Sequence, residues 1–332
     1  MKIIIRANGG AKIGMGHIMR SSVLADQLRK FAHVIFVCED LEEFKPGVDY
    51  LVKKNYKVIL VKPDKLISKL KNVSADVLIT DSYDVTPEYF EELSENFPVT
   101  GYIDDLAVFI PRVTFVLNQN IYAGDLKYDS GNAEEFLLGP GYLLLRDEFH
   151  GVNPIATNSV LTNVMITLGG SDDSNLTGEL IKEITTAHPE LTLHVVVGAA
   201  FAHSDALELQ VSQSGNPGNI LLYHSPKMSN LMRKMDLAVS ACGSTVYELA
   251  VCGVPTIGIV TANNQMMLAE KMAGLGLMKY LRNISAIGEV IDSYDYKRRL
   301  EITDRVSALF NPDGAEKAAD RIKELVIASK LT

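Results

Sequence analysis

Residues 2–20, KIIIRANGGAKIGMGHIMR, contain an apolar run, a glycine-rich loop and the start of a predicted helix. Lys2–Arg6 has the composition of a buried strand, and His17–Lys30 has the pattern of a helix. Glycine lets the backbone approach a ligand closely, and the N-terminus of a helix favours anions. Because an imidazole can accept a proton near neutral pH, we expect a catalytic loop with His17 at the mouth of the helix.

Short apolar runs alternate with longer amphipathic stretches along the rest of the chain. Near-continuous apolar runs of this kind are typical of strands buried on both faces of a parallel sheet, and the alternation indicates βαβ units. The predicted strands are Lys2–Arg6, His33–Cys38, Lys57–Val61, Val77–Thr80, Val99–Ile103, Val113–Leu117, Val164–Leu168, Leu193–Val197, Ile220–Tyr223, Leu237–Ser240 and Thr256–Ile259. Pro87–Asn96 and Ala315–Lys330 are further predicted helices.

The length and the position of a polar segment predict two domains. A chain of 332 residues is long enough for two domains of about 150 residues each. Asp147–Asn163 lacks a helical period and is rich in turn-forming residues, which indicates a linker. We therefore expect an α/β protein with two Rossmann-like domains, residues 1–150 and 160–332, that face one another across a cleft. In open α/β sheets, ligands bind at the carboxyl ends of the strands.

The composition restricts the function classes. A net charge of −9 argues against nucleic acid as a partner, because phosphate backbones are bound by clustered Lys and Arg. No apolar run is long enough to insert into a membrane, and no signal peptide is visible, so a cytoplasmic protein is expected. Cys38, Cys242 and Cys252 lie near apolar stretches and are predicted to be buried thiols. The six histidines other than His17 are scattered and no His/Asp pair has ligand spacing, so no metal is expected. No P-loop is present, and no cofactor is expected.

His17 can be interpreted in two ways. A single loop histidine usually caps a helix or packs against it, but His17 follows two glycines and opens a helix that carries Arg20, which favours a catalytic role. The spacing differs from the dinucleotide fingerprint G-x-G-x-x-G, because Met19 stands where the third glycine is required. A nicotinamide cofactor is therefore not indicated.

Two segments of the second half follow predicted strands and contain glycine. Gly169-Gly170-Ser171-Asp172 could cradle a phosphate with its N–H groups, or form an ordinary turn capped by Ser171 or Asp172. Gly243-Ser244-Thr245 begins a predicted helix whose first turn suits a diphosphate. Glu248, one turn later, could accept hydrogen bonds from ribose hydroxyls or complete a capping box.

Other polar side chains come just after predicted strands. The amides of Asn263–Gln265 could bind a sugar or diphosphate, or cap the helix that follows. Each of those in the first half could bind a sugar or simply form a turn. They are Asp81, Tyr83, Asp104, Asp105, Asn118 and Asn120.

Taken with these motifs, the chain resembles the UDP-2,4-diacetamido-2,4,6-trideoxy-β-L-altropyranose hydrolases of pseudaminic acid biosynthesis. That group is related to spore-coat polysaccharide proteins and, more distantly, to the peptidoglycan UDP-GlcNAc transferase. The resemblance covers roughly Met1–Tyr280 and leaves the tail after residue 310 unmatched. Its markers are Ile13–Arg20, Ile103–Asp105, Leu117–Asn118, Leu145–Phe149, Leu168–Asp172 and Ser240–Glu248.

The resemblance implies a fold of the GT-B type with the nucleotide mainly on the C-terminal domain. The position of His17 implies the general base, and that of Glu248 implies a ligand of the uridine ribose. The expected partner is a small UDP-sugar, bound by a monomer. The substrate-binding candidates are Gly14, Gly16, Arg20, Asp81, Tyr83, Asp105, Asn118, Arg146, Gly169, Gly170, Ser171, Gly243, Ser244, Thr245, Glu248, Asn264 and Gln265.

Three functions compete at this level. The first is hydrolysis, in which His17 deprotonates a water that attacks the anomeric carbon, and UDP leaves. The second is a glycosyltransferase of the same fold, in which an acceptor hydroxyl replaces the water. The third is a nucleotide-sugar-binding regulator without turnover.

Overall fold

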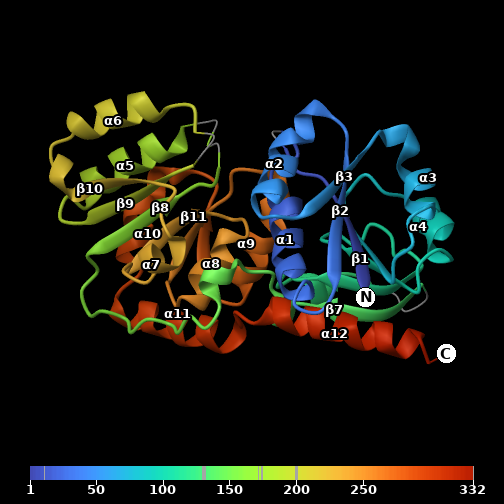
Figure 1. Cartoon of the computed structure of the whole chain (residues 1–332). Coiled ribbons are helices and arrows are strands. Elements are labelled where there is room, and N and C mark those ends of the chain that lie inside the picture. Colours follow the sequence, from blue (N-terminus) through green and yellow to red (C-terminus); the bar gives the residue numbers. More distant parts are fainter. Residues whose placement is uncertain (11, 129–131, 171, 173–174, 199–200, 332) are drawn as a thin grey trace. The chain divides into compact units, whose positions relative to one another are not determined.

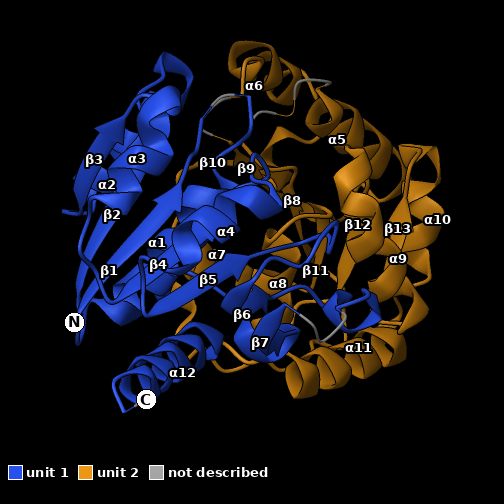
Figure 2. Ribbon diagram, turned by 90° about the vertical axis from the view of Figure 1, so that its right-hand side faces the viewer, with its two compact units in different colours: residues 1–147, 313–332 blue, residues 148–312 orange. Residues whose placement is uncertain are grey.

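The computed structural model describes residues 1–332 except 11, 129–131, 171, 173–174, 199–200 and 332 (Figure 1). The chain divides into two compact units, unit 1 with Met1–Asp147 and Asp313–Thr332, and unit 2 with Glu148–Pro312 (Figure 2). Each unit contains one sheet in which every neighbouring pair of strands is parallel. The predicted pair of Rossmann-like domains is thereby confirmed.

Unit 1 has a seven-stranded sheet in the order β3-β2-β1-β4-β5-β6-β7. All six runs predicted as strands in this half form strands. The strands are β1 (Lys2–Ala7), β2 (His33–Glu39), β3 (Lys57–Val61), β4 (Val77–Asp81), β5 (Val99–Ile103), β6 (Val113–Asn118) and β7 (Ala133–Leu138). The sequence analysis missed β7, an edge strand in which Glu134 and Glu135 interrupt the apolar pattern.

Helices cover both faces of this sheet. They are α1 (Gly16–Leu28), α2 (Lys45–Lys53), α3 (Leu66–Lys71), α4 (Pro87–Ser94) and α12 (Gly314–Ser329). Successive side chains of β1 point to opposite faces, as the period of a strand requires. Ile3 and Ile5 therefore pack in one core with residues of α1 and α12, whereas Ile4 packs in the other core with residues of α3 and α4.

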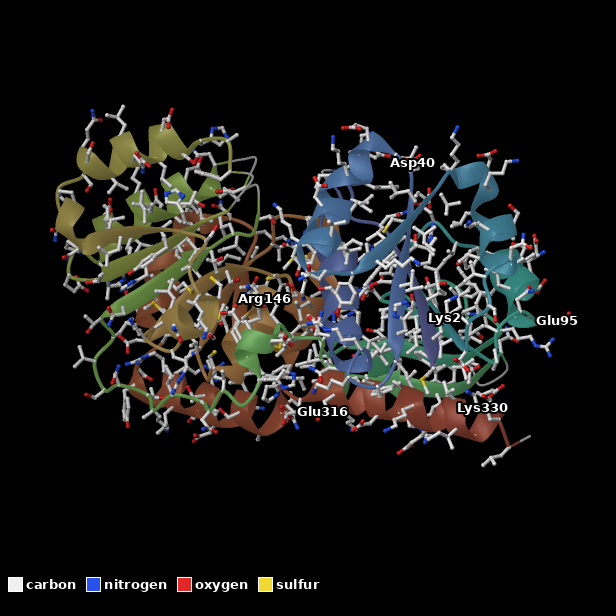
Figure 3. All side chains as sticks on the ribbon, in the orientation of Figure 1. Lys2, Asp40, Glu95, Arg146, Glu316 and Lys330 are labelled. Carbon is white, nitrogen blue, oxygen red and sulfur yellow. The ribbon has the colours of Figure 1, made fainter. Side chains whose placement is uncertain are left out.

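Helix α12 returns to unit 1 after unit 2 is complete (Figure 2). Ala315, Ile322 and Val326 are fully buried in the core that contains α1. Near the end of the helix, Lys330 pairs with Asp76 at 2.8 Å, and the same carboxylate accepts a hydrogen bond from the backbone N–H of Lys2 (labelled in Figure 3). The sequence correctly predicted this helix, but its assignment to a C-terminal domain of residues 160–332 differs from the contacts, which group it with the first unit.

Unit 2 has a six-stranded sheet in the order β10-β9-β8-β11-β12-β13. Its strands are β8 (Asn163–Thr167), β9 (Thr192–Val197), β10 (Ile220–His224), β11 (Leu237–Ala241), β12 (Thr256–Ile259) and β13 (Met278–Leu281). Its helices are α5 (Leu176–Ala187), α6 (Ser204–Ser212), α7 (Met228–Met232), α8 (Thr245–Val251), α9 (Met266–Gly274), α10 (Ile287–Asp292) and α11 (Tyr296–Leu309). The sequence analysis missed β13, a four-residue edge strand that contains Lys279.

The strand order places two loops of each unit at a topological switch point, where open α/β sheets bind ligands. In unit 1, β1 pairs with β4 in a register that sets Ala7 beside Asp81, so the loops after both strands begin together. In unit 2, β8 pairs with β11 and Thr167 lies beside Ser240. The Gly169 and Gly243 loops therefore start from adjacent strands.

Candidate active site

The loop before α1 requires glycine at two positions. Gly14 has φ +77°, a left-handed conformation that side chains disfavour. Its carbonyl accepts a hydrogen bond of 3.0 Å from the N–H of Gly10. A Cβ at Gly10 would lie 1.8 Å from the carbonyl oxygen of Glu43, so only glycine fits against that segment. The closed loop leads directly into α1, which places His17 in the first turn.

His17 forms a buried pair with Asp81 at the carboxyl end of β4. The imidazole Nδ1 lies 2.6 Å from Oδ1 of Asp81, whose side chain is fully buried. Burial alone would raise the pKa of this carboxyl, but the charge and hydrogen bonds of Arg20, together with His17, hold the pKa well below its usual range. The ionised carboxylate therefore accepts from Nδ1–H, which leaves the lone pair of the neutral ring on Nε2.

The other ring nitrogen of His17, Nε2, is not engaged by Asp81. No hydrogen bond within the described part of the chain reaches it, and it is absent from the buried polar atoms there that lack a partner. The small exposed fraction of His17, 7%, therefore includes Nε2. A histidine with Nδ1 fixed by a carboxylate and Nε2 open can act as a general base.

Three residues on one face of α1 converge on Asp81. His17, Arg20 and Ser21 stand at helical positions i, i+3 and i+4, which share a face. Arg20 donates from Nε to Oδ2 at 2.8 Å and from Nη2 to Oδ1 at 2.6 Å, and Ser21 Oγ donates to Oδ2 at 2.8 Å. The carboxylate thus accepts four hydrogen bonds, all from side chains of α1.

A second carboxylate, Asp105, lies on the other side of Arg20. Nη1 of Arg20 donates to both oxygens of Asp105, at 2.8 and 2.7 Å. Tyr83 donates its hydroxyl to the same carboxylate at 2.6 Å, and Nδ2 of Asn120 donates at 2.7 Å. The Tyr83 ring meets His17 edge to face, with centroids 4.5 Å apart, and its half-exposed side chain forms a wall beside the imidazole.

A polar layer supports this site from β5 and β6. Asn118 is fully buried; its Oδ1 accepts from the N–H and the amide of Asn120, and its Nδ2 donates to the hydroxyl of Tyr128 at 2.8 Å. Tyr128 donates in turn to Asp104, which also accepts from two backbone N–H groups of its own loop. In the structure Asn118 therefore orders the loops that carry Asp105 and Asn120.

In unit 2, the Gly169–Gly170 turn follows β8, and Gly169 has φ +92°. Asp172 accepts hydrogen bonds from the N–H groups of Leu176 and Thr177, at 3.0 and 2.8 Å, and so caps the start of α5. This is the capping role that the sequence analysis considered beside phosphate binding. Ser171, another candidate, lies outside the described residues.

The loop after β11 leads into α8 as predicted. Gly243 and Ser244 precede the helix, which begins at Thr245. Glu248 lies one turn into α8 with 7% of its surface exposed. These residues start from the strand next to the one that carries Gly169, so the predicted nucleotide-binding segments of unit 2 leave neighbouring strands of one sheet.

The remaining candidates lie in loops. The side-chain oxygen Oε1 of Gln265 accepts from the backbone N–H of Thr261 at 2.9 Å and thereby closes the loop before α9. Asn264 is exposed beside it. Arg146, labelled in Figure 3, is half-buried in the last residues of unit 1 before Asp147.

The structure unites eight of the predicted residues of unit 1 in one hydrogen-bonded network. They are His17, Arg20, Asp81, Tyr83, Asp104, Asp105, Asn118 and Asn120. Sequence reasoning missed Ser21 and Tyr128. The helical spacing of Ser21 from His17 was a usable signal, whereas nothing in the sequence connects Tyr128 with Asn118.

Other sequence expectations concern metals, membranes and thiols. Among the described residues, no group of three His, Cys, Asp or Glu side chains is placed to hold a metal ion. None of the described helices is long and apolar enough to cross a membrane. Cys38, Cys242 and Cys252 are buried free thiols as predicted, and burial raises the pKa of each to about 12.

The sequence is similar to a glycosyltransferase domain family and to several named proteins. Residues 164–321 match the glycosyltransferase family 28 C-terminal domain. The chain is 26% identical to the spore coat polysaccharide biosynthesis protein SpsG of Bacillus subtilis, over 83% of this chain and 82% of that protein. It is 23% identical to the UDP-2,4-diacetamido-2,4,6-trideoxy-β-L-altropyranose hydrolase of Campylobacter jejuni, over 83% of this chain and 97% of that protein.

A third relative has a name with two parts. It is the pseudaminic acid cytidylyltransferase and UDP-2,4-diacetamido-2,4,6-trideoxy-β-L-altropyranose hydrolase of Helicobacter pylori, 28% identical over 80% of this chain. The match covers only 46% of that protein. The resemblance to this group of proteins is thus supported, and no single member is singled out.

Solved structures confirm the predicted GT-B fold. MurG of Acinetobacter baumannii superposes with a TM-score of 0.71 at 15% identity, over 97% of this chain and 99% of that one. The calicheamicin glycosyltransferase CalG4 gives 0.65 at 14% identity, over 98% of each chain. UDP-GlcNAc 2-epimerase of Neisseria meningitidis gives 0.62 at 12% identity, over 99% of this chain and 100% of that one. Transferases and an epimerase share the fold, so the reaction must be argued from the site.

Proposed function

We propose that this protein is an enzyme that hydrolyses a UDP-linked diacetamido-trideoxy sugar to UDP and free sugar, in the biosynthesis of a nonulosonic acid such as pseudaminic acid. The observation that carries the proposal is the His17–Asp81 pair, with Nδ1 fixed at 2.6 Å and Nε2 open. The substrate class is supported by the relatives named as hydrolases of such a sugar and by the family 28 domain match.

In the proposed reaction, Nε2 of His17 accepts a proton from a water whose oxygen attacks the anomeric carbon. The bond between that carbon and the diphosphate oxygen breaks, and UDP leaves with the electron pair. Asp81 keeps its hydrogen bond to Nδ1 and stabilises the imidazolium as it forms. A single displacement inverts the anomeric configuration. The imidazolium then returns its proton to solvent.

Unit 2 is proposed to hold the nucleotide. The Gly169–Gly170 turn and the turn of Gly243, Ser244 and Thr245 at the start of α8 are proposed to face the diphosphate. The N–H of Gly243 donates to the carbonyl of Ala241 at 2.8 Å, so within that turn the N–H groups of Ser244 and Thr245 are the proposed donors. Glu248 accepts from the uridine ribose. Their place after β8 and β11, the adjacent strands at the switch point, supports this assignment. Arg146 is proposed as a cation for the departing diphosphate, so that no metal is needed.

A glycosyltransferase is the second candidate, because the family 28 match and MurG belong to that class. The same Nε2 could deprotonate an acceptor hydroxyl in place of water. The two reactions differ in whether water alone suffices: a hydrolase releases UDP from the sugar nucleotide in buffer, whereas a transferase requires an acceptor.

The test is a UDP-release assay over bacillosamine-derived and altrose-derived UDP-sugars, first without and then with sugar acceptors. His17→Asn should lower turnover by at least about 10²-fold and leave UDP affinity nearly unchanged, because a general base acts in the transition state. His33→Asn, at an exposed position of β2, is the matched control and should retain full activity. Near-normal turnover of His17→Asn would remove His17 from the mechanism.

A further inference from the structure

Arg20 is engaged on both sides by carboxylates of the protein. Nε and Nη2 donate to Asp81, and Nη1 donates to both oxygens of Asp105, so each nitrogen of the guanidinium already has an anionic partner. Only 12% of the side chain is exposed. An arginine that binds a phosphate uses an edge of its fork for that purpose, and here both edges are occupied.

We propose that Arg20 is a positioning residue for His17. The positive charge of the Arg20 guanidinium keeps the His17–Asp81 pair in the form that can accept a proton. Asp105 partly neutralises the guanidinium and so limits its effect on the pair. This inference rests on the proposed role of His17 as the general base. It departs from the sequence-based expectation that Arg20 binds substrate directly.

The electrostatic reason for this role is that His17, Asp81 and Arg20 lie within hydrogen-bond distance of one another. A buried carboxylate beside an imidazole favours the imidazolium, which cannot accept a proton. Nη2 of Arg20 lies 3.2 Å from Nδ1 of His17 and opposes that second positive charge. Nη2 donates to Asp81 rather than to the ring, because Nδ1 carries a proton in the neutral pair. Asp105 in turn neutralises part of the guanidinium charge.

Other ionisable groups face this cluster from the neighbouring elements. They are Tyr83 before α4, Tyr102 on β5, Asp104 after β5 and Tyr122 after β6. Burial, followed by the nearby carboxylates, raises the pKa of the three tyrosines above the ordinary value. The phenols are therefore neutral in the working range, and Arg20, Asp81, Asp105 and Asp104 carry the local charge.

The proposal predicts shifts of opposite sign for two substitutions. Arg20→Met removes the opposing cation, so the acidic limb of the kcat/KM profile should shift to higher pH by about one unit or more. Such a shift corresponds to about a tenfold rise in the proton affinity of the pair. Asp105→Asn leaves more of the guanidinium charge unneutralised beside the His17–Asp81 pair and should shift the acidic limb to lower pH. Arg20→Lys keeps a charge and should move the limb less than Arg20→Met does.

The experiment measures UDP release against pH for these variants, together with UDP affinity by calorimetry. His33→Asn, at an exposed position of β2 outside this cluster, is the control, and the acidic limb of its profile should stay at the same pH. Shifts of the same sign in Arg20→Met and Asp105→Asn would overturn the proposal. So would a pH-independent loss of activity in Arg20→Met with weakened UDP binding, which would make Arg20 a substrate ligand.

NMR titration of the His17 ring separates this inference from the proposed function. Its resonance is identified by its loss in His17→Asn, and its midpoint should move up in Arg20→Met and down in Asp105→Asn. If the parent protein releases no UDP from any sugar tested, the proposed function fails while these midpoints still decide the role of Arg20. If Arg20→Met does not fold, an unmoved or raised midpoint in Asp105→Asn overturns the inference.

Discussion

Replacement of Asp81 by Asn is the sharpest perturbation of the candidate active site. Each carboxylate oxygen accepts two hydrogen bonds: Oδ1 from His17 and Arg20, and Oδ2 from Arg20 and Ser21. The amide of Asn has only one acceptor oxygen. If that oxygen faces Arg20 and Ser21, the amide N–H groups face Nδ1 of His17. The ring must then accept at Nδ1 and carry its proton on Nε2, which is the tautomer that cannot act as a base.

The change of tautomer at His17 sets the expected loss of activity. The corresponding Asp→Asn change in a catalytic triad lowers kcat by about 10⁴-fold through the wrong tautomer, so we expect a loss of about 10³–10⁴-fold, or about 4–5.5 kcal/mol. The free energy of unfolding should fall by about 3 kcal/mol, the lower end for breaking a buried ion pair, because Arg20 retains Asp105.

The assay is UDP release under saturating substrate, with chemical denaturation to measure stability. Ser21→Ala is the control: it removes one neutral donor from Oδ2 and leaves the bond to His17 intact, so it should cost only about 0.5–1.5 kcal/mol of stability. A folded Asp81→Asn protein with kcat within about tenfold of the parent would refute the tautomer argument.

Three further predictions concern the nucleotide, the metal and the last helix. Glu248→Ala should weaken UDP binding by about 1–3 kcal/mol in calorimetry, the loss of charge-assisted bonds to ribose; unchanged affinity would take Glu248 out of the nucleotide site. The enzyme should keep its rate in EDTA, since oriented N–H groups replace a cation; loss of activity on chelation that Mg²⁺ or Mn²⁺ restores would contradict this. Ile322→Ala should cost about 2–5 kcal/mol of stability, measured by denaturation, because the side chain is fully buried against α1, whereas Ile327→Ala, at a half-exposed position, should cost far less. Equal losses in the two isoleucine variants would show that α12 is not packed as described.

The positions of eleven strands were accessible from the sequence because strands buried on both faces leave apolar runs between helices. The edge strands β7 and β13 were not, since charged residues such as Glu134 and Lys279 break the pattern where one side of a strand faces no neighbour. The placement of α12 was also inaccessible. Its apolar residues have helical spacing, and this spacing fits either sheet equally well.

The sequence predicted which residues belong to the candidate site but not which of them form hydrogen-bonded pairs. His17 follows β1 and Asp81 is the last residue of β4, yet their pairing depends on the register of β1 against β4, in which Ala7 lies beside Asp81. The sequence analysis placed Arg20 among the substrate-binding residues, on the helix that follows the glycine-rich loop. The contacts of Arg20 with Asp81 and Asp105 come from three segments and cannot be read from local spacing.

The return of α12 to unit 1 has a consequence for protein synthesis. The core around β1 and α1 contains Ala315, Ala318, Ile322 and Val326, so unit 1, most of which is synthesised before unit 2, lacks one of its packing surfaces until unit 2 has also been made. At about 5–20 residues per second, that delay is on the order of 10–40 s. Unit 2 needs no later segment and can fold during translation, so the N-terminal domain completes its core last and is the part of the nascent chain most exposed to aggregation and chaperones.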